Sequence, residues 1–204
     1  MLFDDTYKTI SHAAQGVFSD RGSKFIAYTF PIRSDNEVKK LVSQIKTEHP
    51  KARHYCWALR LSPDRSIFKL NDDGEPPGTA GRPILNTLLS FDVTDTLVIV
   101  VRYFGGTLLG VPGLINAYKT ATVEALNASR IISKTLNDVY RIEFTYMQMN
   151  AVMKVLKEES LTFKNQTSDV TCSLEVEIRK SDVNTVISKI NKIESLKLTY
   201  LHTI

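Results

Sequence analysis

The chain has 204 residues, of which 43% are hydrophobic and 24% charged, a balance that excludes both a large multidomain machine and a disordered chain. Its 26 Lys and Arg and 22 Asp and Glu residues give a net charge of +4, too small to identify a nucleic-acid-binding module by charge alone. Cys56 and Cys172 have no neighbouring thiol, so neither a disulfide framework nor a CxxC zinc site is expected. Hydrophobic runs such as 97–101 are too short to span a membrane, and we expect a cytoplasmic protein.

The first third of the chain predicts a strand, a helix and a hairpin. Residues 24–32 are rich in aromatic and β-branched side chains, which favours a strand. Ser34 and Glu37 have the spacing of a capping box and begin an amphipathic helix. Residues 54–61 alternate between two faces and pair, by way of a Ser-Pro-Asp turn, with a second strand at 66–70.

The middle of the chain holds two glycine-rich loops around a helix and a buried strand. Proline and glycine forbid regular structure across most of 71–81, and a helix follows at 82–91. The inward stripe of this helix is predicted to be Leu85, Leu88 and Leu89. Residues 97–101 lack alternation and suit a central strand covered on both faces. Residues 102–113 form the second loop, with Pro112 as the first residue of a helix that carries Gly113 and alanines at four-residue intervals.

From about residue 134 the predicted order becomes β-α-β-β-α-β, which is the ferredoxin-like arrangement. The strands are predicted at 139–146, 162–166, 170–178 and 195–201, and the helices at 148–159 and after a capping Ser181. We therefore place a boundary near residues 132–135, between a first domain over residues 1–133 and a ferredoxin-like domain over residues 134–204.

The two loops contain most of the residues that could take part in binding or catalysis. The first contains three acidic side chains, Asp72, Asp73 and Glu75, and the second begins at Arg102. Glycine backbone beside a helix start exposes N–H groups that favour an anion such as a phosphate. The spacing matches neither GxGxxG nor a P-loop, because Val111 stands where the P-loop requires lysine.

Each of these features also has a purely structural interpretation. Glycines serve tight turns with positive φ, acidic residues can simply be solvated, and the order Asp-Asp-Gly-Glu does not match a calcium-binding loop. His54 leads a buried-looking strand and is predicted to be a structural histidine rather than a general base. The sequence contains no GxSxG elbow, HExxH motif or plausible Cys/His pair. We therefore expect no catalytic residues, no metal and no cofactor.

Two long motifs give the sequence a specific resemblance. The signature of the IMPACT/YigZ family is similar to DDGEPPGTAGRP at residues 72–83 and to VRYFGGTLLG at 101–110. Segments 22–27 and 54–58 resemble earlier parts of the family, so the resemblance covers essentially the entire chain. Pro77 departs from the small polar residue that members more often carry, which implies a stiffer loop.

The resemblance implies an α+β protein. Its N-terminal domain would be a two-layer α/β domain similar to domain IV of elongation factor G, and its ferredoxin-like domain would resemble domain V. The resemblance also implies translation regulation, since the eukaryotic relative interferes with activation of a kinase that senses amino-acid starvation by competing for a partner protein. For bacterial members, a nucleic-acid-binding or ribosome-associated role is the usual proposal.

These observations lead to a non-enzymatic protein that binds RNA or the translation apparatus. In this hypothesis Arg102, Arg82, Lys24 and the glycine backbone of the second loop contact phosphates, while Tyr103 or Phe104 stacks on a base. One alternative is a small-molecule or metal site, possibly enzymatic, in which the three acidic residues bind a cation or act as acid and base and Arg102 orients an anionic substrate. The other is a protein-docking surface. The predicted binding residues are Lys24, His54, Asp72, Asp73, Glu75, Thr79, Arg82, Arg102, Tyr103, Phe104, Gly105, Gly106 and Gly110.

Overall fold

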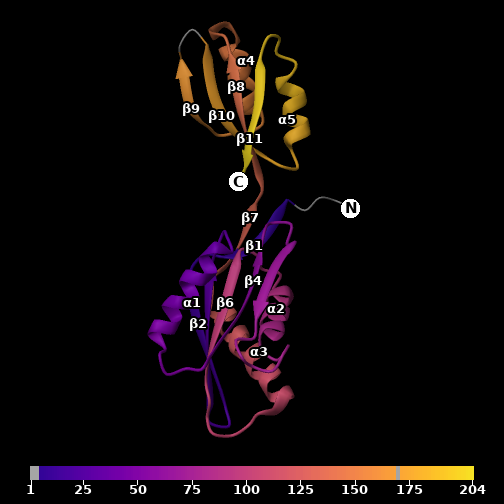
Figure 1. Cartoon of the computed structure of the whole chain (residues 1–204). Coiled ribbons are helices and arrows are strands. Elements are labelled where there is room, and N and C mark those ends of the chain that lie inside the picture. Colours follow the sequence, from indigo (N-terminus) through magenta and orange to yellow (C-terminus); the bar gives the residue numbers. More distant parts are fainter. Residues whose placement is uncertain (1–4, 169–170) are drawn as a thin grey trace. The chain divides into compact units, whose positions relative to one another are not determined.

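The chain folds into two compact units (Figure 1). The structure, a computed structural model, describes residues 5–168 and 171–204. One unit is Tyr7–Lys134, and the other is Thr135–Ile204 together with Asp5 and Thr6. Among the described residues, no helix combines the length and hydropathy needed to cross a bilayer.

A five-stranded antiparallel sheet forms the middle of Tyr7–Lys134, with the strand order β2-β3-β6-β4-β5. Its strands are β2 (Ala14–Asp20), β3 (Ser23–Pro31), β4 (His54–Leu61), β5 (Ile67–Asn71) and β6 (Thr96–Tyr103). The helices of this unit are α1 (Asn36–Glu48), α2 (Gly81–Ser90) and α3 (Gly110–Ala128). Two further strands, β1 (Thr6–Ile10) and β7 (Ile131–Thr135), pair with each other.

Helices cover both faces of this sheet, so the unit has three layers rather than the predicted two (Figure 1). The α1 helix packs on the face that contains Ile99 and Val101, whereas α2 and α3 pack on the face that contains Val98 and Val100. The cause lies in β6, where every residue from 97 to 101 is fully buried. A strand that is hydrophobic on both faces needs a covering layer on each. The prediction of a central, doubly covered strand is confirmed.

Small residues allow α3 to lie directly against β2. Ala117, Ala121 and Ala125 are fully buried, as their four-residue spacing predicts. A Cβ atom added to Gly16 of β2 would lie 2.2 Å from the backbone nitrogen of Ala125. The close approach of the helix to the sheet therefore depends on a missing side chain.

Three local predictions differ from the structure. Leu89 is 46% exposed, because it lies beyond the edge of the buried stripe of α2, to which Ile84 belongs instead. The second loop is shorter than predicted, since β6 extends to Tyr103 and α3 begins at Gly110 rather than Pro112. The capping box of α1 is only half formed. The Glu37 carboxylate accepts the Ser34 N–H at 3.0 Å, but the Ser34 hydroxyl accepts the N–H of Asn36 instead of that of Glu37.

The C-terminal unit has the predicted ferredoxin-like order. Its strands are β8 (Asn137–Phe144), β9 (Phe163–Ser168), β10 (Cys172–Arg179) and β11 (Lys197–Thr203), arranged β11-β8-β10-β9. Its helices are α4 (Met149–Glu158) and α5 (Val183–Ile190), with a short 3-10 helix η1 (Tyr146–Gln148) before α4. Both α helices share one hydrophobic core with the sheet.

Two details of this unit differ from the sequence-based expectation. Ser181 does not cap α5, because Asp182 occupies the N-cap and the Ser181 hydroxyl donates to the Asp182 carboxylate at 2.9 Å. Asp5 belongs to this unit rather than to the first domain, since its carboxylate accepts hydrogen bonds from the Arg179 guanidinium at 2.7 and 2.9 Å. Val170, at the start of the predicted strand 170–178, lies outside the described residues.

Candidate functional site

A buried ion pair joins the two predicted loops at one end of the Tyr7–Lys134 sheet. Glu75 lies in the first loop, and Arg102 lies in β6 just before the second. The Arg102 Nη1 donates to the two carboxylate oxygens of Glu75 at 2.6 and 2.9 Å, and the side chains are only 7% and 3% exposed. Tyr118 of α3 donates to the same carboxylate at 2.8 Å. The pair thus fixes the first loop to both β6 and α3.

Aromatic rings flank the guanidinium group of this pair. The Arg102 Cζ lies 5.6 Å from the ring centroids of both Phe25 and Phe104, within cation–π range. Phe25 is fully buried, whereas Phe104 is 52% exposed. The Phe104 ring is therefore an exposed aromatic surface that is held in place by the buried Arg102 guanidinium.

Cys56 and Tyr118 extend the network into the core. The Cys56 Sγ lies 2.9 Å from the carbonyl oxygen of Asp72 and 3.3 Å from the Tyr118 hydroxyl. Burial raises the pKa of both the Cys56 thiol and the Tyr118 hydroxyl, and the nearby Glu75 carboxylate raises them further. Both groups consequently stay protonated at neutral pH. A buried, protonated thiol is a structural group rather than a nucleophile.

The first loop is organised by its own acidic side chains. The Asp72 carboxylate accepts the backbone N–H groups of Gly78, Ala80 and Gly81 at 2.9, 3.0 and 2.8 Å. Asp73 accepts the N–H of Tyr55 at 2.7 Å. With Glu75 in its ion pair, all three predicted acidic residues bind groups of the chain itself. The geometry therefore gives no support to their use as cation ligands or as an acid and a base.

His54 and Thr79 also serve the shape of this loop. The His54 Nδ1 lies 2.9 Å from the carbonyl oxygen of Asp73, and the buried Thr79 hydroxyl donates to the carbonyl of Pro76 at 2.7 Å. Both residues therefore hold loop backbone, which agrees with the structural interpretation of His54.

The second loop packs against the turn between β2 and β3. A Cβ atom on Gly105 would lie 1.9 Å from the carbonyl carbon of Gly22, and the Gly105 N–H donates to the Ser23 hydroxyl at 3.1 Å. Gly106 has a φ of +86° and open space around it. Gly105 is thus required for packing, while Gly106 leaves backbone accessible. Gly110, with a φ of +70°, is the first residue of α3.

The structure separates some of the residues that the sequence grouped. Tyr103 faces away from the network, with its hydroxyl 2.8 Å from the Nδ1 of His49 on the α1 side of the sheet. Lys24 is exposed on β3 and is the cross-strand partner of Tyr103, so its side chain leaves the sheet on the α1 face. It lies at the end of β3 that meets the second loop, one residue after Ser23. Arg82 is exposed on α2 and belongs to a neighbouring groove.

This groove, of about 350 Å³, runs between α2 and α3 beside the first loop. Arg82 and Lys119 supply its two cations, and Ile115 is part of its apolar wall. Leu108, just before α3, is 81% exposed, and Val111, one helical turn before Ile115, is 52% exposed. Val111 lies two turns before the buried Tyr118 on the same helical face. From this spacing Val111 is expected to be buried in the core. Sequence reasoning therefore did not identify Val111 as an exposed surface residue.

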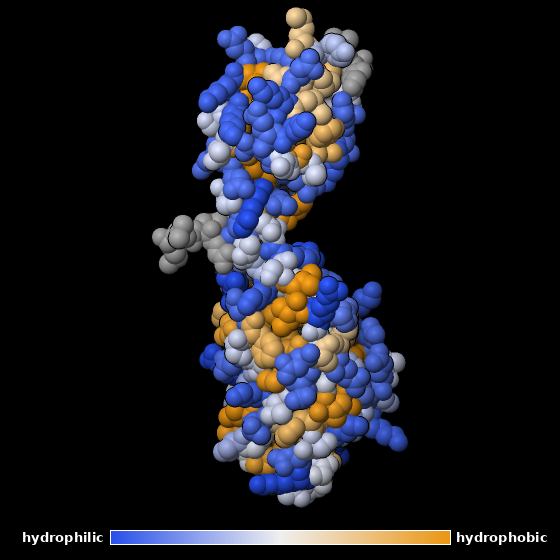
Figure 2. Space-filling view, turned by 180° about the vertical axis from the view of Figure 1, so that it is seen from behind, coloured by the Kyte–Doolittle hydropathy of each residue, from blue (hydrophilic) through white to orange (hydrophobic). Residues whose placement is uncertain are grey.

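Exposed hydrophobic side chains of Tyr7–Lys134 gather at two places. One is the second loop and the start of α3, just described, and the other is strand β5. Figure 2 shows, on the visible face of this unit (lower in the view), separate hydrophobic areas among hydrophilic residues. Exposed hydrophobic patches of this kind mark interaction surfaces more often than chance.

In the C-terminal unit, the sheet face opposite α4 and α5 carries paired charges. Neighbouring strands place Arg141 against Glu175 at 2.8 Å and Lys164 against Glu177 at 2.6 Å. A third pair joins Lys197 and Glu143 at 2.7 Å. Since these cations already have carboxylate partners, this face offers less to a nucleic acid than the loop end of the other unit does.

Comparison with known proteins identifies the family. The Impact N-terminal domain family matches residues 21–126. The IMPACT family member YvyE of Bacillus subtilis is 30% identical over 179 residues, which is 88% of this chain and 82% of that protein. YigZ of Escherichia coli is 35% identical over 136 residues, 66% of this chain and 67% of that protein. A crystal structure of a hypothetical protein, 28% identical, covers 97% of this chain and 98% of its own with a TM-score of 0.68. The resemblance carried by the two loop motifs is thus confirmed, and the chain belongs to the IMPACT family.

Proposed function

We propose that this protein is a non-enzymatic binding protein that engages single-stranded RNA of the translation apparatus with the loop end of its Tyr7–Lys134 sheet. The observation that carries the proposal is the exposed ring of Phe104, held beside Arg102. Exposed Lys24 follows Ser23, whose hydroxyl accepts the N–H of Gly105 in the same loop. An aromatic ring next to cations and accessible glycine backbone is the arrangement on which unpaired bases stack while their phosphates are neutralised.

Within this proposal, Arg102 has a positioning role. Its guanidinium is buried and donates to Glu75, so it holds the loops and the Phe104 ring rather than meeting a phosphate. The phosphate contacts fall to the exposed cations Lys24 and Arg82, with Lys119 in the groove beside Arg82.

A binding role fits this site better than a catalytic one. The thiol of Cys56 and the hydroxyl of Tyr118 are buried with raised pKa values, and the carboxylates of the first loop are engaged by the chain's own donors. General acid–base catalysis needs a titratable group that can reach a substrate. The choice of an RNA of the translation apparatus rests on the resemblance to the IMPACT family, which implies translation regulation.

The test is the affinity of the full chain for a fluorescein-labelled single-stranded RNA, measured by fluorescence anisotropy over a range of salt concentrations. Lys24→Ala is expected to weaken binding for all RNA sequences and to reduce the slope of log affinity against log salt by about 0.7. Phe104→Ala is expected to weaken binding about tenfold or more, through lost stacking.

Lys40→Ala is the matched control, because Lys40 is also an exposed lysine and lies on α1 of the same unit. It should leave both the affinity and the slope nearly unchanged. Salt-independent binding, or equal losses for Lys24→Ala and Lys40→Ala, would contradict the proposal.

A further inference from the structure

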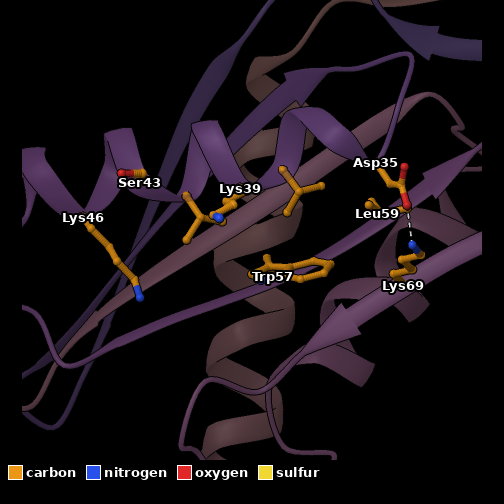
Figure 3. Close-up of a pocket in the computed structure, with 9 residues that line it drawn as sticks. Asp35, Lys39, Ser43, Lys46, Trp57, Leu59 and Lys69 are labelled. Atoms are coloured by element: carbon orange, nitrogen blue, oxygen red, sulfur yellow. Dashed lines mark hydrogen bonds and ion pairs between the residues drawn. The ribbon is translucent and has the colours of Figure 1, made fainter.

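A second surface of the Tyr7–Lys134 unit has the features of a binding groove, on the opposite face of the sheet from α2 and α3. It has a volume of about 450 Å³, within the range of ligand sites. Figure 3 shows Trp57 between helix α1 and strand β5, with lysine side chains around it. The residues that line the groove are Asp35, Val38, Lys39, Val42, Ser43, Lys46, Trp57, Leu59 and Lys69.

The groove combines an apolar interior with a cationic rim. Trp57 and Leu59 of β4 supply apolar surface, and Lys39, Lys46 and Lys69 supply three positive charges. Its one carboxylate, Asp35, pairs with Lys69 (Figure 3). The groove therefore keeps a net positive charge, which complements an acidic ligand with apolar side chains.

Strand β5, at the border of this groove, is an edge strand with exposed hydrophobic residues. It is last in the strand order, and all five of its residues are exposed. Ile67, Phe68 and Leu70 are 46%, 58% and 36% exposed. Edge strands are usually protected by charge, proline or bulges, because their outer backbone groups pair readily with another strand. Here the only charged residue is Lys69, which is held by Asp35.

We propose that β5 and the groove together bind an extended acidic segment of a partner protein, which adds as a sixth strand beside β5. In such strand addition, main-chain hydrogen bonds supply affinity and alternate side chains supply specificity. The acidic side chains of the segment point into the groove beside Trp57 and reach Lys39 and Lys46. The alternate, apolar side chains point to the other face and pack on Phe68 and Leu70. Five residues of partner strand span about 17 Å, the length of β5.

Strand β5 has exposed side chains on both of its faces, which supports an added strand as the occupant rather than a ligand confined to the groove. Lys69 is the cross-strand partner of Leu59, on the groove side, whereas Phe68 is the partner of Arg60, on the other side. A ligand within the groove leaves Phe68 and Leu70 uncovered. An added strand carries side chains to both faces and covers them.

Charge argues against a second copy of this chain as the occupant. A two-fold dimer through β5 places the same patch on both sides of the interface. Lys39, Lys46 and Lys69 of one copy would then meet the same cations of the other, and like charges in an interface are unfavourable. An acidic partner removes this repulsion.

Trp57 is the single tryptophan of the chain, so its fluorescence reports directly on the groove. The probe is a synthetic eight-residue peptide that alternates glutamate with leucine, and its control has lysine in place of glutamate. The acidic peptide is expected to shift the Trp57 emission saturably and to move the amide NMR signals of residues 67–71. The basic peptide should do neither.

Two variants with the same charge change test the location. Lys39→Glu is expected to weaken binding of the acidic peptide about fivefold. Lys40→Glu, the next residue on α1 but outside the groove, should stay within about twofold. Equal effects of the two variants, or an unshifted Trp57 emission with the acidic peptide, would overturn the proposal.

Backbone methylation tests the strand itself. A peptide methylated on the nitrogens along one edge should lose binding, and one methylated along the other edge should keep it, because only one edge pairs with β5. Undiminished binding of both peptides would show that the segment does not add as a strand. A dimer in sedimentation velocity that Phe68→Glu dissolves would assign β5 to a second copy and refute the partner.

Discussion

Replacing Arg102 by methionine tests the buried ion pair that fixes the two loops. The change removes the positive charge but keeps an apolar stem, and it leaves the Glu75 carboxylate at 3% exposure with only Tyr118 as donor. Removing one partner of a buried pair costs about 3–5 kcal/mol. The Arg102 Nε is itself buried without a hydrogen-bond partner. Removing this unsatisfied donor stabilises the fold by about 1 kcal/mol and offsets part of the loss. We therefore expect Arg102→Met to lower the free energy of unfolding by about 2–4 kcal/mol.

The assay is urea denaturation followed by tryptophan fluorescence at neutral pH. Since Trp57 lies in the Tyr7–Lys134 unit, the signal reports the unfolding of that unit alone. Adding Glu75→Gln to Arg102→Met removes the uncompensated charge while keeping an acceptor for Tyr118. The double variant should therefore recover about 1 kcal/mol or more relative to additive losses.

Lys119→Met is the control, because it removes an exposed cation from α3 and should change stability by less than about 0.5 kcal/mol. A loss below about 1 kcal/mol for Arg102→Met, or strict additivity in the double variant, would refute the account of the pair.

Further predictions concern the second loop and Asp5. Gly105→Ala should destabilise the unit by about 1–3 kcal/mol, because the new Cβ meets the backbone of Gly22. Gly106→Ala, with open space but a φ of +86°, should cost only about 1 kcal/mol; equal urea midpoints for the two variants would contradict this. Arg179 holds the pKa of the Asp5 carboxyl well below its usual range through hydrogen bonds. Asp5 therefore stabilises the fold above its ordinary pKa of about 3.9, and this contribution is lost as pH falls through the lower folded value. Circular dichroism should accordingly show Asp5→Asn to be less stable than the parent by about 1–3 kcal/mol at pH 7, with a difference that shrinks below about pH 4. A constant difference would mean that Asp5 does not act through its charge.

The periodic parts of the fold were predictable because burial leaves a direct mark on sequence. The unbroken run 97–101 predicts a strand covered on both faces, and the spacing of Ala117, Ala121 and Ala125 predicts the face on which α3 is buried. The ferredoxin-like order follows from the same kind of pattern. The prediction of two layers for the N-terminal domain came from the family resemblance rather than from the residues. It was wrong, because α1 covers the face of the sheet opposite α2 and α3.

The contacts of the candidate site were less accessible to sequence reasoning. Glu75 and Arg102 are 27 positions apart, and no local pattern shows that an acidic residue in a loop will be buried against a strand arginine. The exposure of Val111 is equally hidden, since its spacing from Tyr118 is that of a core residue. The burial of the Glu75–Arg102 pair and the exposure of Val111 both depend on which parts of the sheet the helices and loops cover. Only the three-dimensional structure shows this.

The most direct test of the account is ultraviolet crosslinking of the full chain to a single-stranded RNA, with the modified residue identified by mass spectrometry. The account predicts crosslinks at Phe104 and in neighbouring residues of segment 101–110, which Phe104→Ala abolishes. Crosslinks confined to the C-terminal unit, or to α1 on the opposite face of the sheet, would contradict it.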